Sequence, residues 1–151
     1  MGKHIVVIPG DGIGREVTDA AVEILKKTDE IYHLDFTYEW KDAGGTAYDK
    51  YGVPLPEETV SACRRGDGIL FGAVGGDQWD HLEPSLRPEK AILGLRKSLG
   101  LYVNLRPVKI QDSMIEYSPL KPEIARGTDI MIVLELVGGI YFGKRCESEI
   151  N

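Results

Sequence analysis

The chain has 151 residues, of which 42% are hydrophobic and 28% charged, a balance typical of a globular domain. Its net charge of −6, with 18 scattered basic residues, argues against nucleic acid or an anionic membrane as a partner, although focused arginines can still bind an anionic substrate. No run approaches the roughly 20 apolar residues of a membrane span, and the start lacks a signal-peptide pattern, so we expect a cytoplasmic protein. Cys63 and Cys146 fit neither a disulfide framework nor a zinc site, so we expect reduced thiols and no metal ligand in this chain.

The first forty residues contain two strand patterns separated by a helix pattern. Residues 3–8 form a short apolar, β-branched run that predicts a buried strand, and it ends in a glycine-rich turn. Apolar residues at helical spacing predict a helix over residues 15–27. Apolar and polar residues then alternate over residues 34–40, which predicts a strand with one buried face.

The next thirty residues repeat this alternation of elements. Residues 42–52 are rich in turn-forming residues, and a short helix with proline and acids at its start is predicted over residues 54–65. A third apolar strand is predicted over residues 68–73. Strands alternating with helices indicate an α/β sheet with helical crossovers, and strands 3–8 and 68–73 should lie in one sheet.

The second half begins with a long polar loop over residues 74–87, and a loop of this length in a compact domain is usually functional or disordered. A helix is predicted over residues 88–99. A strand over residues 102–108 should be broken by Pro107, and residues 130–134 form an apolar run typical of a buried strand.

The helix after the loop carries four residues that share one face. Glu89, Ile92, Leu93 and Arg96 are spaced at i, i+3, i+4 and i+7. One interpretation is a boundary face with a surface ion pair. The other is a pocket wall, with an apolar centre and a cation beyond it, that suits a branched carboxylic acid.

Two further residues and one glycine-rich segment carry alternative interpretations. Arg106 ends a strand and is either solvated or a two-point carboxylate ligand that converges with Arg96. Tyr141 is either a packing residue or a general acid. The glycines of residues 10–14 have the spacing G-x-G-x-G and lack the later acidic residue of a dinucleotide fingerprint, so we interpret them as a tight turn.

Taken together, the motifs resemble the 3-isopropylmalate dehydrogenases, within the isocitrate/isopropylmalate dehydrogenase family, in their order and spacing from residue 3 to about residue 144. The segments that carry the resemblance are IPGDGIGREV at 8–17, GAVGG at 72–76, LRPE at 86–89, LGLRK at 93–97, NLRP at 104–107 and GGIYFG at 138–143.

This resemblance implies a three-layer α/β/α fold that is not a Rossmann fold, with NAD bound at its own loop. It implies oxidative decarboxylation of (2R,3S)-3-isopropylmalate to 2-oxoisocaproate in leucine biosynthesis, by a homodimer that uses Mg²⁺ or Mn²⁺ as a Lewis acid. Residues 1–101 would be the first part of the first domain, and residues 102–151 the beginning of the second, dimerisation domain. The family's catalytic lysine and metal-binding aspartates are expected beyond residue 151.

The resemblance also assigns residues. Arg96 and Arg106 match substrate-carboxylate ligands, Glu89, Ile92 and Leu93 match the wall that meets the isopropyl group and the nicotinamide, and Tyr141 matches the enolate-protonating tyrosine. Cofactor contacts are expected from Glu89 and from a set of turn and loop residues: Ile13, Gly75, Gly76, Asp77, Gln78, Trp79 and Asp80.

Two departures from the family pattern leave other functions open. Leu134 stands where the family usually has a third substrate arginine, although considered alone it is a buried strand residue, and Asp77-Gln78 replace the usual Pro-Lys. The alternatives are a catalytically inactive truncated product or pseudoenzyme, a related tartrate- or homoisocitrate-type dehydrogenase, and a small-molecule- or nucleotide-binding module without chemistry. We expect the 151-residue chain alone to be inactive.

Overall fold

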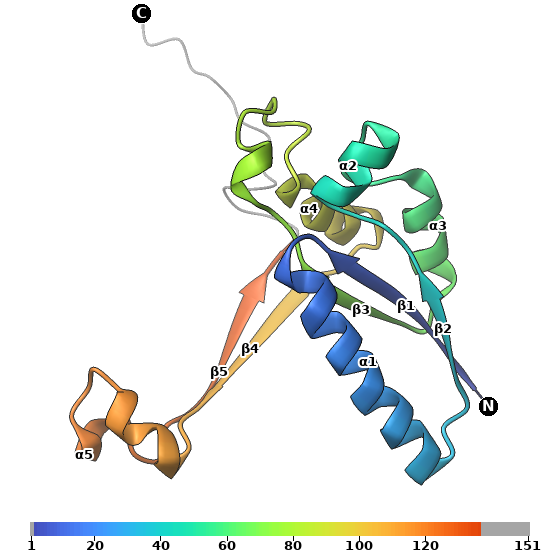
Figure 1. Cartoon of the computed structure of the whole chain (residues 1–151). Coiled ribbons are helices and arrows are strands. Elements are labelled where there is room, and N and C mark those ends of the chain that lie inside the picture. The colour runs from blue at the N-terminus through green and yellow to red at the C-terminus, as the bar shows by residue number, and fades with distance from the viewer. Residues whose placement is uncertain (1, 137–151) are drawn as a thin grey trace, which may run out of the picture. The chain divides into compact units, whose positions relative to one another are not determined.

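The computed structural model describes residues 2–136 and divides the chain into two compact units, Met1–Leu99 and Gly100–Asn151 (Figure 1). The expected division into a first domain ending at residue 101 and a second beginning at residue 102 stays a prediction. The predicted glycine-framed segment 138–143 lies outside the described residues.

The first unit is built on a three-stranded parallel sheet in the order β2-β1-β3. Its strands are β1 (Lys3–Gly10), β2 (Phe36–Trp40) and β3 (Gly68–Ala73). The predicted pairing of the first and third strands in one sheet is therefore confirmed. The predicted buried face of β2 is only partly buried, because Trp40 at its end is 46% exposed.

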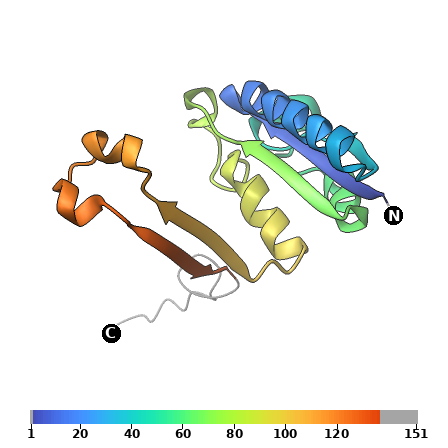
Figure 2. The ribbon, with the colours of Figure 1, turned by 90° about the horizontal axis from the view of Figure 1, so that it is seen from below.

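Helices cover both faces of this sheet, which gives the predicted three layers. Figure 2 shows α1 (Ile13–Tyr32) on one face and α4 (Glu89–Ser98) on the other. Val6 and Ile8 of β1 are fully buried in a cluster with residues of α4 and of α3 (Glu57–Arg65). Side chains alternate along a strand, so Val7, also fully buried, points to the opposite face. The helix predicted over residues 15–27 exists and extends further at both ends.

One prediction in this unit is wrong, because residues 42–52 are more than a turn: they contain α2 (Gly45–Tyr51). The residue before this helix is Gly44, which has no side chain for a cap. The cap comes instead from Asp11, whose carboxylate accepts hydrogen bonds from the backbone N–H groups of Gly45 at 2.8 Å and Thr46 at 2.7 Å. A cap supplied from 34 residues away leaves no local signal in the sequence.

The second unit contains an antiparallel pair, β4 (Val103–Lys109) and β5 (Asp129–Glu135). A 3₁₀ helix (Asp112–Tyr117) and a short α5 (Pro122–Ala125) connect the two strands. Pro107 does not break β4 as predicted, and a two-stranded sheet tolerates proline because each strand has a free edge. The prediction that residues 130–134 are buried is also wrong, since every residue of β5 is exposed.

Candidate functional site

The loop between β3 and α4 holds most of the residues assigned to the cofactor, and it is ordered by two internal anchors. Its first anchor is Trp79, which is 7% exposed and lies in a 3₁₀ turn, Asp77–Trp79. The indole N–H of Trp79 donates to Asp49 of α2 at 3.0 Å. The indole ring packs so closely on Gly45 that a Cβ on this glycine would lie 2.2 Å from it. Trp79 is thus engaged with α2, while Asp77, Gln78 and Asp80 are exposed.

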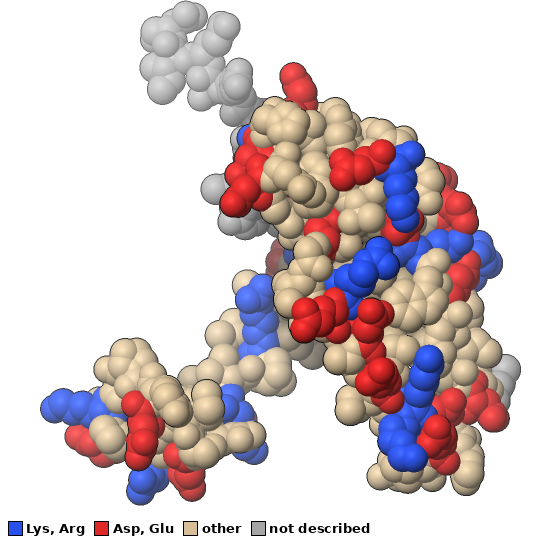
Figure 3. Space-filling model, viewed as in Figure 1, with Lys and Arg blue, Asp and Glu red and all other residues tan. Residues whose placement is uncertain are grey.

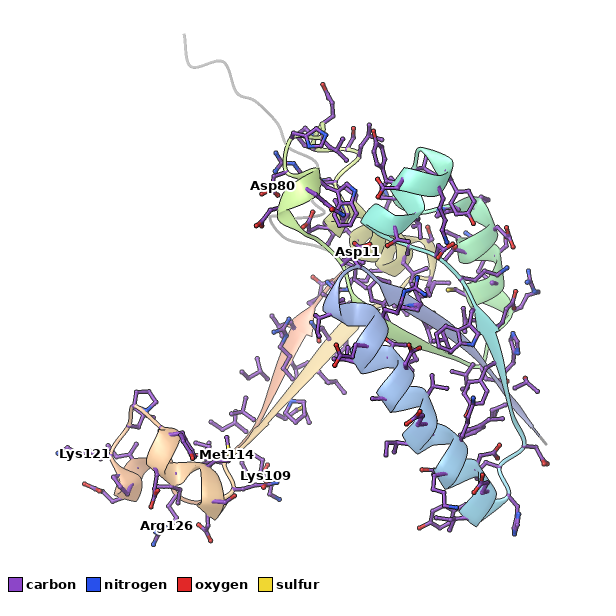
Figure 4. The ribbon with its side chains drawn as sticks, in the orientation of Figure 1. Asp11, Asp80, Lys109, Met114, Lys121 and Arg126 are labelled. Atoms are coloured by element: carbon purple, nitrogen blue, oxygen red, sulfur yellow. The ribbon has the colours of Figure 1, made fainter. Side chains whose placement is uncertain are left out.

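The second anchor is Arg87, which ties the return half of the loop to its outward half. Its guanidinium donates to the carbonyl oxygen of Leu82 at 3.2 Å and to that of Asp80 at 3.1 Å. Figure 4 labels Asp80 on this loop and Asp11 at the carboxyl end of β1. These hydrogen bonds fix the backbone of the loop, in which only three residues, Asp77–Trp79, form a helical turn.

The start of the loop lies directly against the start of α4. Gly75 has a φ of +114°, which side-chain-bearing residues rarely adopt, and a Cβ there would lie 2.8 Å from Oε1 of Glu89. Gly76, the next residue, is exposed. The structure therefore places the Glu89 carboxylate, at the N-terminus of a helix, beside a residue without a side chain.

The predicted shared face of α4 lies at the boundary of the core. Ala91 and Leu95 are buried in the core. On the other positions, Ile92, Leu93 and Arg96 are half-buried and Glu89 is exposed. Neither charged residue forms an ion pair with any residue in the described part of the chain, so the surface ion pair is not formed. This face therefore carries two half-buried apolar side chains, Ile92 and Leu93, between the carboxylate of Glu89 and the guanidinium of Arg96.

In the second unit, Arg106 and Leu134 lie on one face of the hairpin. Leu134 is opposite Asn104 in the register, and Arg106 is opposite Ile132. Residues two apart on a strand share a face, so Leu134 is the diagonal neighbour of Arg106. Leu134 is 40% exposed, so the interpretation as a buried strand residue is wrong. An arginine at position 134 would place a second guanidinium beside the first.

The other residues that the resemblance assigns to the substrate or the cofactor do not lie together in one site of the described structure. Ile13, at the start of α1, is 61% exposed. Arg96 and Arg106 belong to different units, so a pocket shared by the two stays a prediction. Tyr141 lies outside the described residues.

The described residues carry neither a surface region of one charge sign on the face seen in Figure 3 nor a group of metal ligands. Acidic and basic side chains intermingle on the face seen in Figure 3. No group of three or more His, Cys, Asp or Glu in these residues is arranged to hold a metal ion, and no helix among them is long and apolar enough to cross a membrane. Burial, with a smaller contribution from Glu39, raises the pKa of the Cys63 thiol, which makes it a poor nucleophile.

Sequence reasoning missed the residues that support the loop from beneath. Asp11, Gly45 and Asp49 hold the first part of the loop against α2, and none of them was assigned a role. The signal available was an aspartate between two glycines directly after a buried strand, a position where a carboxylate can reach several backbone N–H groups.

Comparison with known proteins places this geometry in a family. Residues 4–151 match the model of the isocitrate/isopropylmalate dehydrogenase family. The chain is 54% identical over 151 residues to a 3-isopropylmalate dehydrogenase from Bacillus licheniformis, covering all of this chain and 41% of that protein. It is 52% identical over 148 residues to one from Clostridium pasteurianum, covering 97% and 42%. Among solved structures, a β-decarboxylating dehydrogenase from Thermococcus kodakarensis matches with a TM-score of 0.68 and 35% identity, over 99% of this chain and 38% of that one.

The chain belongs to the isocitrate/isopropylmalate dehydrogenase family. It spans about 41% of the length of a curated 3-isopropylmalate dehydrogenase that it matches over all 151 residues.

Proposed function

We propose that this chain supplies the cofactor loop and part of the substrate site of an NAD-dependent 3-isopropylmalate dehydrogenase, acting within a longer enzyme. The observation that carries the proposal is the 54% identity over all 151 residues to a curated enzyme of that name. The boundary face of α4 supports the same substrate, because the half-buried apolar side chains of Ile92 and Leu93 share it with the cation of Arg96. A branched dicarboxylate needs both kinds of contact.

In this proposal Arg96 and Arg106 each bind a substrate carboxylate through two N–H groups, since a guanidinium matches the two oxygens of a carboxylate. Ile92 and Leu93 contact the isopropyl group and exclude water from it. Tyr141 donates the proton to the enolate that remains after CO₂ leaves. These roles rest on the family match.

The residues around Gly75 fit a nicotinamide cofactor. A Cβ at Gly75 would fill the space in front of Glu89, so glycine keeps that space open to a flat group. The Glu89 carboxylate is an acceptor for an amide N–H such as that of a carboxamide. Ile13 is an exposed apolar side chain that can pack on a ring. When bound, NAD would supply the acceptor for the hydride that leaves the carbon carrying the substrate hydroxyl.

A divalent Mg²⁺ or Mn²⁺ ion belongs to the same proposal, with ligands outside residues 2–136. When bound, such an ion would supply a Lewis acid for the substrate hydroxyl and for the carbonyl formed from it. The complete enzyme is proposed to be a cytoplasmic homodimer.

One observation favours a second candidate, a catalytically inactive member of the family. Leu134 occupies the position diagonal to Arg106, where the resemblance leads us to expect an arginine. Without that guanidinium, the carboxylates of the substrate lose one charged hydrogen-bond donor.

The test is a chimera in which all 151 residues of this chain replace the matching residues of the 3-isopropylmalate dehydrogenase from Bacillus licheniformis. We expect NADH formation that depends on 3-isopropylmalate and on Mg²⁺ or Mn²⁺, with lower kcat/KM for isocitrate, homoisocitrate and tartrate. A higher kcat/KM for one of those three acids would overturn the assignment of 3-isopropylmalate as the substrate. Absence of activity with all four, in a chimera that binds NADH, would favour the inactive member.

A further inference from the structure

Asp11 is a buried charged residue to which neither the sequence nor the proposed function assigns a role. It follows the buried strand β1 and is only 2% exposed. Besides capping α2, its Oδ2 atom accepts a hydrogen bond from the backbone N–H of Gly75 at 2.9 Å. The backbone N–H of Asp11 donates to the carbonyl oxygen of Ala73, two residues before Gly75, at 2.6 Å. Asp11 is therefore bonded to α2 and to the end of β3, where the loop begins.

The same carboxylate oxygen joins two segments that are far apart in the sequence. Oδ2 of Asp11 accepts from Gly45 of α2 and from Gly75 of the loop, while Oδ1 accepts from Thr46. Four residues beyond Gly75, Trp79 packs on Gly45 from another side. The first part of the loop is thus held to α2 at two points, and the first point depends on one carboxylate.

The bonded glycine is also the one that faces Glu89. Since a Cβ on Gly75 would lie 2.8 Å from the Glu89 carboxylate, a small shift of Gly75 changes the opening in front of that group. The position of Gly75 therefore determines whether a flat ring fits beside Glu89. Asp11 itself is buried beneath the loop and has its carboxylate engaged by three N–H groups.

We infer that Asp11 is a positioning residue for the nicotinamide cofactor: its carboxylate fixes Gly75, and through Gly75 the face of the loop that meets NAD beside Glu89. The inference rests on the proposed function for the identity of the ligand. The competing explanation is that Asp11 only caps α2 and contributes stability to the whole unit. The two explanations predict different results for an Asp11 variant: they differ in which backbone amides lose protection from hydrogen exchange and in which Michaelis constants change.

The first experiment is amide hydrogen exchange on the 151-residue chain with Asp11→Asn. Asparagine keeps the shape, but an NH₂ group replaces one acceptor oxygen and would face N–H donors, and its remaining oxygen is uncharged and accepts more weakly. We expect the Gly45, Thr46 and Gly75 amides to lose roughly tenfold or more of their protection, while the amide of Val7 in β1 keeps its protection. An unchanged Gly75 amide would overturn the inference, and equal losses in β1 would show a role in global stability only.

Asp67→Asn is the matched control, because Asp67 also accepts a backbone hydrogen bond, from His4 at 2.9 Å, at the other end of β1. In this variant the His4 amide should lose protection and the Gly75 amide should keep it. Loss of protection at Gly75 in this control would contradict a specific action of Asp11.

The second experiment uses the chimera described above and separates the two Michaelis constants. Asp11→Asn should raise the KM for NAD roughly tenfold or more and leave the KM for 3-isopropylmalate within about twofold. Asp67→Asn should change neither. If both constants rise together, or if the KM for NAD is unchanged, the positioning role is refuted.

A variant of the loop itself covers the case in which Asp11→Asn does not fold. Gly75→Ala leaves Asp11 in place, strains the backbone at φ +114° and narrows the opening at Glu89, so it should reproduce the increase in the KM for NAD. No change in Gly75→Ala would refute the inference that Asp11 acts at this point. An inactive parent chimera that does not bind NADH would overturn the proposed function and the cofactor role of Asp11 together, whereas the exchange experiment tests the bond to Gly75 independently.

Discussion

The two units of the chain use similar strands and bury them to very different extents. In the first unit Val6, Val7 and Ile8 of β1 are fully buried, because β1 lies between two other strands and has helices on both faces. In the second unit Ile132 and Val133 of β5 are 45% and 62% exposed. Both segments are rich in β-branched residues, so composition alone does not account for the difference.

The exposure of a strand therefore depends on which other strands and helices cover it. The described part of the second unit has a two-stranded sheet, and such a pair is marginal in water without a further strand or a packed helix. The first unit therefore contains its own core, and the second presents a sheet face with Arg106 and Leu134 side by side. Four predictions test this contrast.

The largest effect is expected from truncating a core side chain of the first unit. Ile8→Ala should lower the free energy of unfolding by about 2–5 kcal/mol, because it removes buried methyl groups and leaves a cavity in a fully buried site. Ile132→Ala in β5 is the control, with an expected change within about 0.5–1 kcal/mol. Urea denaturation of the 151-residue chain measures both, and equal losses would mean that the two units are equally packed.

The second prediction asks whether the exposed face of the hairpin is a binding face. In the chimera, Leu134→Arg should raise kcat/KM for 3-isopropylmalate roughly ten- to several-hundred-fold, because a charged hydrogen bond contributes about 1.5–3 kcal/mol. A bulky cation that does not reach the substrate should instead lower the melting temperature. Equal kcat/KM in the two proteins would show that position 134 does not touch the substrate.

The third prediction measures how well the core of the first unit satisfies its polar groups. Thr59 and Thr18 are each 2% exposed, but Thr59 donates to the carbonyl oxygen of Asp42 at 2.7 Å, whereas the Thr18 hydroxyl has no hydrogen-bond partner in the described part of the chain. Thr59→Val should cost about 1 kcal/mol of unfolding free energy. Thr18→Val should cost nothing or stabilise. A loss in Thr18→Val as large as in Thr59→Val would indicate that its hydroxyl is bonded.

The smallest effect concerns an exposed carboxylate at the edge of the first unit. The backbone N–H of His4, and then Lys3, lower the pKa of Asp67. A carboxyl group with a lowered folded-state pKa stabilises the fold above its unfolded pKa, and this contribution is lost as the pH falls through the folded value. Asp67→Asn should therefore lower the melting temperature slightly at pH 7, and the difference should shrink as the pH falls below the ordinary pKa range of an aspartate. A difference that does not shrink with falling pH would assign the effect to packing.

Much of the first unit could be predicted because its signals are local. The apolar run 68–73 coincides with β3, and helical spacing identified a boundary face of α4, with its apolar centre and its two charges. The loop over residues 74–87 was singled out as functional or disordered from its length alone, and only the family resemblance linked it to NAD. Its anchors were not predicted, since Trp79 reaches Asp49 across 30 residues and no periodicity records such a bond.

The strand and helix patterns, and the motifs that indicate the family, follow from neighbours along the chain, because φ/ψ preferences and the periods of 2 and 3.6 residues are local properties. Three features followed from contacts between distant residues: the helix α2 capped by Asp11, the exposure of β5, and the fixed position of Gly75 against Glu89. Each depends on where a remote group lies in space. A carboxylate satisfies whichever N–H groups the fold brings to it, and a strand is buried only when another layer covers it.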